Sequence, residues 1–117
     1  MVVVVKLAIY LLLETLPSPR NVYNECIKQG LSHPEIVTKQ FILETGWGKH
    51  YKYNNLFGLY NSSTHDYYKF HTWQQSVEGY RDLIQYRYKG GDYYKWLESV
   101  GYAEDSMYIS KLKRIRL

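Results

Sequence analysis

One stretch decides the fold: Phe41-Ile42-Leu43-Glu44-Thr45-Gly46-Trp47-Gly48. An apolar, helix-like run carries a carboxylate near its end, and two glycines with a tryptophan between them then interrupt that run. Upstream, Ser32 fits a helix N-cap, Pro34 is tolerated in a first turn and Glu35 is placed to complete a capping box. We therefore predict a helix from Ser32 to Thr45.

The position of Glu44 on this helix suggests acid–base chemistry. Val37, Phe41 and Glu44 fall on one helical face, with Gln40 beside them, so we expect the carboxylate to point toward the protein. Burial and the negative end of the helix dipole both disfavour its ionised form and raise its pKa. A raised pKa suits a general acid that works near neutral pH. The structural alternative is a helix-terminal glutamate that pairs with Lys49.

The composition indicates one globular domain that spans residues 1–117. The chain is 45% hydrophobic and 22% charged, which argues against disorder. It has 14 Tyr and 3 Trp, more rings than a small core can hide, so some must line a surface or groove. Cys26 is the only cysteine and the four His show no ligand spacing, so we expect no internal disulfide, no metal and no cofactor.

The net charge of +4 fits a mildly anionic partner, and nucleic acid, acidic lipid and an anionic cell-wall polymer all qualify. The densest basic run, residues 111–116, alternates basic and apolar residues as a helix on a core does, so we expect no nucleic-acid partner. The apolar residues 2–13 are interrupted by Lys6 and too short to span a membrane, and they show no clear signal peptide. We expect residues 1–17 to form a lead-in and a first helix, from about Lys6 to Leu16.

Cap and turn residues divide the rest of the chain. Ser18 and Pro19 predict the start of a helix whose buried stripe is Val22, Tyr23, Cys26 and Ile27, and Gly30 ends it. Residues 46–58 are expected to form an irregular loop, and residues 59–70 a small hairpin. Three further helices are expected near residues 73–88, 93–100 and 105–115. The predicted fold class is α+β, predominantly α, with one small hairpin.

Four motifs, in order, resemble one enzyme family: Gln40 to Gly48, Asn54-Asn55-Leu56-Phe57-Gly58, Trp73 to Tyr80, and Gly101 to Tyr108. The chain resembles the peptidoglycan endo-β-N-acetylglucosaminidases of glycoside hydrolase family 73 from about Asn21 to Ile115, within an expected family region of residues 18–117. The resemblance implies a lysozyme-like fold, in which a helical lobe faces a small β-lobe across a sugar groove. It implies cleavage after N-acetylglucosamine in cell-wall glycan strands, outside the cytoplasm, by a protein that we expect to be monomeric and not inserted in a membrane.

The resemblance also implies roles for individual residues. It places the general acid on Glu44. It also implies that a tyrosine of the terminal motif is catalytic or orients the substrate, and Tyr102 is the first choice for it and Tyr108 the alternative. Many members carry a second glutamate in the β-lobe, whereas Asp66 is the only acidic residue here between Glu44 and Glu78. The expected substrate-binding residues are Gln40, Trp47, Asn54, Asn55, Phe57, Tyr60, Tyr68 and Tyr108.

Several alternatives remain open from the sequence. The hydrolysis can proceed by inversion, by double displacement or by attack of the substrate's own acetamido group. A lytic transglycosylase would act on the same polymer with one glutamate. A non-catalytic glycan-binding module would keep the groove but would have Glu44 exposed and facing away from it.

Overall fold

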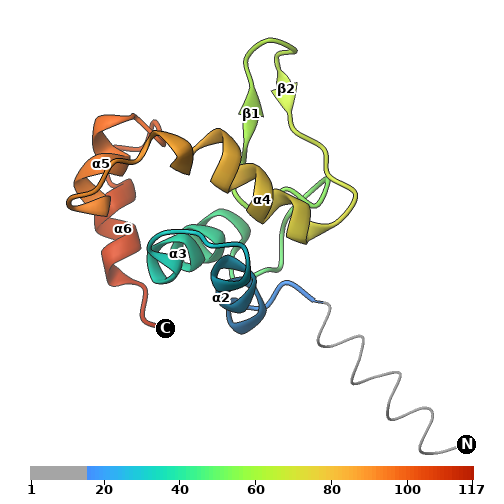
Figure 1. Cartoon of the computed structure of the whole chain (residues 1–117), viewed down its shortest axis with the longest axis horizontal. Helices are drawn as coiled ribbons and strands as arrows, with labels where there is room; N and C mark the ends of the chain where they lie inside the picture. The colour runs from blue at the N-terminus through green and yellow to red at the C-terminus, as the bar shows by residue number, and fades with distance from the viewer. Residues whose placement is uncertain (1–15) are drawn as a thin grey trace, which may run out of the picture.

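The computed structural model describes residues 16–117, so the predicted first helix lies almost wholly outside the described residues. In this part of the chain, five α-helices and one 3-10 turn form the body of the structure, and a two-stranded hairpin projects from it (Figure 1). The elements in chain order are α2 (Pro19–Lys28), α3 (Pro34–Thr45), β1 (Tyr60–Asn61), β2 (Asp66–Tyr67), α4 (Trp73–Leu83), η1 (Gln85–Arg87), α5 (Tyr93–Ser99) and α6 (Tyr108–Arg114). The α+β, predominantly α class is confirmed.

Most of the predicted helix starts are confirmed, because each is set by a local cap. Ser18 accepts a hydrogen bond from the backbone of Asn21 at 3.1 Å, and Asp92 accepts one from Lys95 at 3.1 Å. Thr72 forms a complete capping box with Gln75. The predicted helix end at Gly30 is also confirmed, with φ +75° and the Leu31 amide bonded to the Cys26 carbonyl.

The predicted start of the central helix is wrong. His33, in a left-handed conformation, occupies the N-cap of α3 without a side-chain cap, and Ser32 lies outside the helix. The reason is a long-range contact: the side-chain amide of Gln85 bonds both the amide and the carbonyl of Ser32, at 2.9 and 2.6 Å. These two bonds replace the expected capping box and hold the approach to α3 against η1.

The core lies where α3 packs between α2, α4 and α6. Val22, Val37, Phe41 and Val77 are fully buried there, and a second cluster is centred on Leu97 and Leu112. The predicted stripe of α2 is wrong at Ile27, which is 54% exposed because α3 and α4 cover only the side of α2 that carries Val22 and Cys26. Burial of these apolar side chains holds α3, and with it Glu44, in place.

The hairpin is confirmed but short. Tyr60 pairs with Tyr67 and Asn61 with Asp66 in antiparallel register. In Figure 1 it projects on the far side of α4 from α2 and α3. Within residues 16–117, no helix is both long and apolar enough to cross a membrane.

Candidate active site

The end of α3 is held firmly, which places Glu44. Gly46 ends the helix with φ +56°, and its amide bonds the Ile42 carbonyl. Thr45 donates to the Phe41 carbonyl at 2.7 Å and accepts from the Gly48 amide at 2.8 Å. The two glycines of the opening stretch therefore turn the chain sharply away directly after Glu44.

Glu44 opens onto a groove. Its side chain is exposed, so the prediction that it points into the interior is wrong, although Val37 and Phe41 on the same face are fully buried. Neighbouring protein still removes part of its hydration, and this desolvation raises the pKa of the Glu44 carboxyl, while a hydrogen bond from Tyr108 partly offsets the rise. No ion pair joins Glu44 to Lys49 in the described part of the chain, so the structural alternative is not supported.

The groove consists of three hollows that share lining residues. The central hollow, of about 250 Å³, is lined by Glu44, Phe57, Gly58, Leu59, Tyr60, Ile84, Arg87, Val100, Gly101 and Tyr102. It shares Gly58 with a hollow of about 170 Å³ beside Tyr53 and Tyr67. It shares Gly101 and Tyr102 with a hollow of about 460 Å³ beside Glu98 and Ser110. The hollow that contains Glu44 therefore adjoins two further hollows, one at Gly58 and one at Gly101 and Tyr102.

Gly58 brings the loop after α3 close to the carboxylate. It has φ +62°, and a Cβ built on it would lie 3.2 Å from Oε2 of Glu44. Only glycine gives both the left-handed backbone and this close approach without strain. The sequence places Gly58 in the second motif but does not show that it neighbours Glu44.

The structure brings Tyr108, and not Tyr102, to the acid. The Tyr108 hydroxyl donates to Oε1 of Glu44 at 3.4 Å. The Tyr102 hydroxyl donates instead to the Phe57 carbonyl at 2.9 Å, while its ring lines the central hollow. Gln40 lies fully buried behind them and donates to the Tyr108 hydroxyl at 3.3 Å, so it faces the acid's hydrogen-bond partner and not the cleft.

Asp66 does not reach the acid. It is exposed on β2, where one oxygen accepts from the Tyr67 amide at 2.7 Å and the other lies 3.7 Å from Lys69. It lines none of the three hollows, whose central one holds Glu44 as its only carboxylate among the described residues. The contacts that the structure shows for Asp66 therefore lie within and beside the hairpin and do not include Glu44.

The two asparagines serve the loop that they belong to. Asn55 is buried; its amide donates to the Leu59 and Tyr68 carbonyls at 2.8 and 3.1 Å, and its oxygen accepts from the Leu59 amide at 3.0 Å. Asn54 donates to two carbonyls at 3.2 and 3.0 Å, those of Phe70 and His71. Both amides hold the loop against the hairpin, so the expectation that they bind sugar is not supported.

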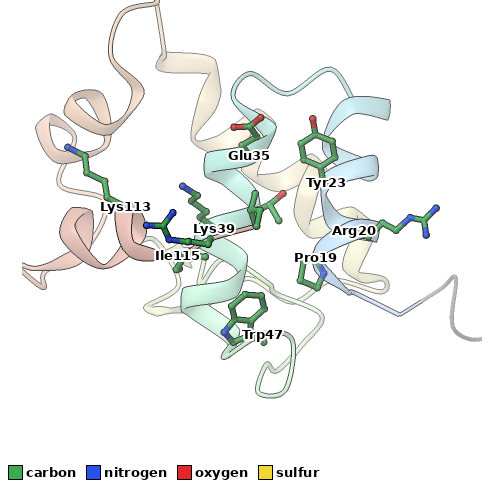
Figure 2. A pocket seen from close by; sticks show the side chains of 11 residues that line it. Pro19, Arg20, Tyr23, Glu35, Lys39, Trp47, Lys113 and Ile115 are labelled. Carbon is green, nitrogen blue, oxygen red and sulfur yellow. The ribbon is translucent and has the colours of Figure 1, made fainter.

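The predicted aromatic residues divide between surface and core. Tyr60 is 52% exposed and lines the central hollow, whereas Phe57 is buried beneath it. Tyr68 is half-buried and stacks on Phe70, with ring centroids 6.3 Å apart. Trp47 lines a separate hollow of about 890 Å³, between α2, α3 and the end of the chain (Figure 2). That larger hollow does not contain Glu44.

Arg87 is a groove residue that the sequence pattern did not indicate. It lies in η1, after α4 has ended, and lines the central hollow together with Glu44. The predicted helix through residue 88 is wrong, because α4 ends at Leu83 and the turn η1 follows it. Ile84, Val100 and Gly101 also line the hollow, and the sequence did not indicate them because they meet only after α4, η1 and α5 have packed together.

A protein-family model matches most of the sequence. This family model, for glucosaminidase domains described as mannosyl-glycoprotein endo-β-N-acetylglucosaminidase, matches residues 20–116. The chain belongs to this family. A search of curated proteins found no match.

Membership of the glucosaminidase family confirms the resemblance drawn from the four motifs. It supports glycan hydrolysis as the general activity, a glycan as the substrate and the cell wall as the site of action. The groove agrees with that general activity, because a carboxyl of raised pKa beside aromatic and basic side chains suits protonation of a glycosidic oxygen.

Proposed function

We propose that this chain hydrolyses the β-1,4 bond after N-acetylglucosamine in bacterial peptidoglycan, with Glu44 as general acid. The observation that carries the proposal is the Glu44 carboxyl, of raised pKa, in a hollow that adjoins two further hollows. A groove of this form accommodates the interior of a glycan strand, which favours endo cleavage. Tyr60 and Arg87 supply an aromatic face and a cation beside the scissile bond.

Glu44 delivers its proton to the glycosidic oxygen. Protonation helps a poor leaving group to depart, and the desolvated carboxyl holds its proton to higher pH than a free glutamate does. Tyr108 donates to Oε1, while Oε2 lies over Gly58 in the groove. After the transfer, the hydrogen bond from Tyr108 stabilises the carboxylate that remains.

We infer that no second carboxylate of the central hollow supplies the attacking group. Glu44 is the only carboxylate among the described residues that line the central hollow, and retaining or inverting pairs need a second one within about 5–9.5 Å. We therefore favour attack by the substrate's own acetamido group, or by a water molecule that a tyrosine hydroxyl holds.

The same observation favours a second candidate, a lytic transglycosylase, because that reaction needs one glutamate and no water. Mass spectrometry of peptidoglycan digests separates the candidates. A reducing-end N-acetylglucosamine is the expected product of the glucosaminidase. A reducing-end muramic acid would indicate a muramidase instead, and an anhydro sugar a transglycosylase.

Exchange of the acid tests whether the chain is an enzyme at all. In Glu44→Gln we expect cell-wall hydrolysis to fall by at least ~10², the scale of lost general acid catalysis, while the fold is kept. Glu35→Gln, on an exposed residue in the first turn of the same helix, is the matched control and should keep full activity. Wall binding without hydrolysis in both the natural chain and Glu44→Gln would establish the glycan-binding module instead.

We further propose that the chain acts as a monomer at the cell wall, without nucleic acid, metal or cofactor.

A further inference from the structure

A row of hydrogen bonds runs through the core from η1 to Glu44. Its side-chain members are contributed by four helical elements and the 3-10 turn, and they are, in order, Gln85, Tyr93, Tyr80, Gln40, Tyr108 and Glu44. The links measure 3.0 Å from Gln85 to Tyr93, 2.7 Å between the two tyrosine hydroxyls, 3.3 Å from Gln40 to Tyr108 and 3.4 Å from Tyr108 to Glu44. Tyr80 donates directly to the oxygen of Gln40.

The row has one direction. A hydroxyl has a single proton, so Tyr80, which donates to Gln40, must accept from Tyr93, and Tyr93 in turn accepts from the amide of Gln85. With its oxygen occupied, Gln40 presents its NH₂ group to the oxygen of Tyr108. The Tyr108 proton is then left to point at Glu44. Every donor in the row therefore points toward the carboxylate.

The surroundings preserve this direction. Gln40 and Tyr80 are fully inaccessible and Tyr93 is 2% exposed, so water does not compete along the middle of the row. Burial raises the pKa of Tyr93 to about 12 and that of Tyr80 well above its ordinary value, so both hydroxyls keep their protons. Aligned hydrogen bonds in a medium of low dielectric constant polarise and strengthen one another.

We propose that Tyr80, Tyr93 and Gln85 are positioning residues that act on Glu44 through Gln40 and Tyr108. They hold the Tyr108 hydroxyl as a donor to Oε1, which fixes the carboxyl and stabilises its charged form. The catalytic consequence rests on the proposed function of Glu44 as general acid.

Few other groups face Glu44. Tyr102 from the terminal segment has its hydroxyl committed to the Phe57 carbonyl, and Tyr60 comes from the hairpin. Arg87 from η1 lines the hollow but is beyond ion-pair distance of the carboxylate in the described structure. Tyr108 is thus the one side chain among residues 16–117 that donates a hydrogen bond to Glu44.

The test is a direct titration of Glu44 by NMR of protein labelled with ¹³C at glutamate carboxyls. The Glu44 signal is the one that disappears in Glu44→Gln. In Tyr80→Phe the Gln40 amide is no longer oriented, so we expect the Glu44 pKa to rise, as in Tyr108→Phe. Tyr93→Phe, one link farther away, should give a smaller rise. Tyr88→Phe is the matched control, because its ring contacts Tyr93 but its hydroxyl lies outside the row, and it should give no change.

A double-variant cycle shows whether the effect passes through Tyr108. Once Tyr108→Phe has removed the last donor, adding Tyr80→Phe should leave the Glu44 pKa unchanged. An equal shift with and without Tyr108, or no shift in folded Tyr80→Phe and Tyr93→Phe, would overturn the proposal. On cell wall, the positioning role predicts a lower kcat with little change in KM. The titration needs no substrate, so it can succeed even where the proposed hydrolysis fails.

Discussion

Exchange of Gly58 for alanine tests the geometry of the proposed acid most directly. The new Cβ would lie 3.2 Å from Oε2 of Glu44, so the carboxylate must move by a few tenths of an ångström. Misplacement of a catalytic group by 1 Å costs roughly 100-fold, which scales to about 3- to 10-fold here. The added methyl group also displaces water from the carboxyl, so the Glu44 pKa should rise further. The basic limb of the pH profile should then move to higher pH.

Backbone strain must be separated from this effect. Gly58 has φ +62°, and alanine in the left-handed region costs about 1–2 kcal/mol. Gly30→Ala is the matched control, because Gly30 has φ +75° and its Cβ would meet nothing within 4 Å. Both variants should lower Tm by roughly 4–10 °C.

The assay is clearing of a purified peptidoglycan suspension, at a temperature where both variants are fully folded. Only Gly58→Ala should lose activity and shift its pH profile. Equal activities in the two variants would refute the placement of the Glu44 carboxylate over Gly58.

Three further outcomes are expected. Asp66→Asn should reduce activity less than about threefold, since Asp66 contacts only the hairpin; a loss comparable to that of Glu44→Gln would restore it as a catalytic residue. Tyr108→Phe should lower kcat more than Tyr102→Phe does, because only the Tyr108 hydroxyl bonds Glu44. Tyr102→Phe should instead lower Tm, because it removes a hydrogen bond to the Phe57 carbonyl worth about 1 kcal/mol. Kinetics and melting curves of both variants check this, and the reverse pattern would show that Tyr102 is the hydrogen-bond partner of Glu44. The Glu44 pKa is raised on folding. The contribution of this carboxyl to the stability of the folded state is therefore complete below its pKa in the unfolded chain, and it is lost as pH rises through its pKa in the folded protein. Glu44→Gln should therefore raise Tm at pH 7 but not at acidic pH, and a Tm difference that does not change with pH would contradict a raised Glu44 pKa.

The sequence by itself determined the local structure. The caps at Ser18, Thr72 and Asp92 join residues three apart, so they can be predicted from the sequence without any tertiary contact. The turn after Glu44 is of the same kind, because Gly46 and Gly48 allow backbone conformations that other residues resist. The four motifs were also sufficient to identify the family, which residues 20–116 match.

Only the tertiary structure decided which groups meet at the acid. Tyr108 and Glu44 are 64 residues apart, and Tyr102 and Phe57 are 45 apart, so no local spacing distinguishes the two tyrosines. Helical spacing correctly placed Glu44 beside Val37 and Phe41, but it could not show that the Glu44 side chain lies outside the packed core and opens onto a groove. The direction of the buried hydrogen-bond row also depends on the tertiary structure. Each hydroxyl in the row has a single proton, and the side chains that it connects come from four helices and η1, so the row exists only in the packed core.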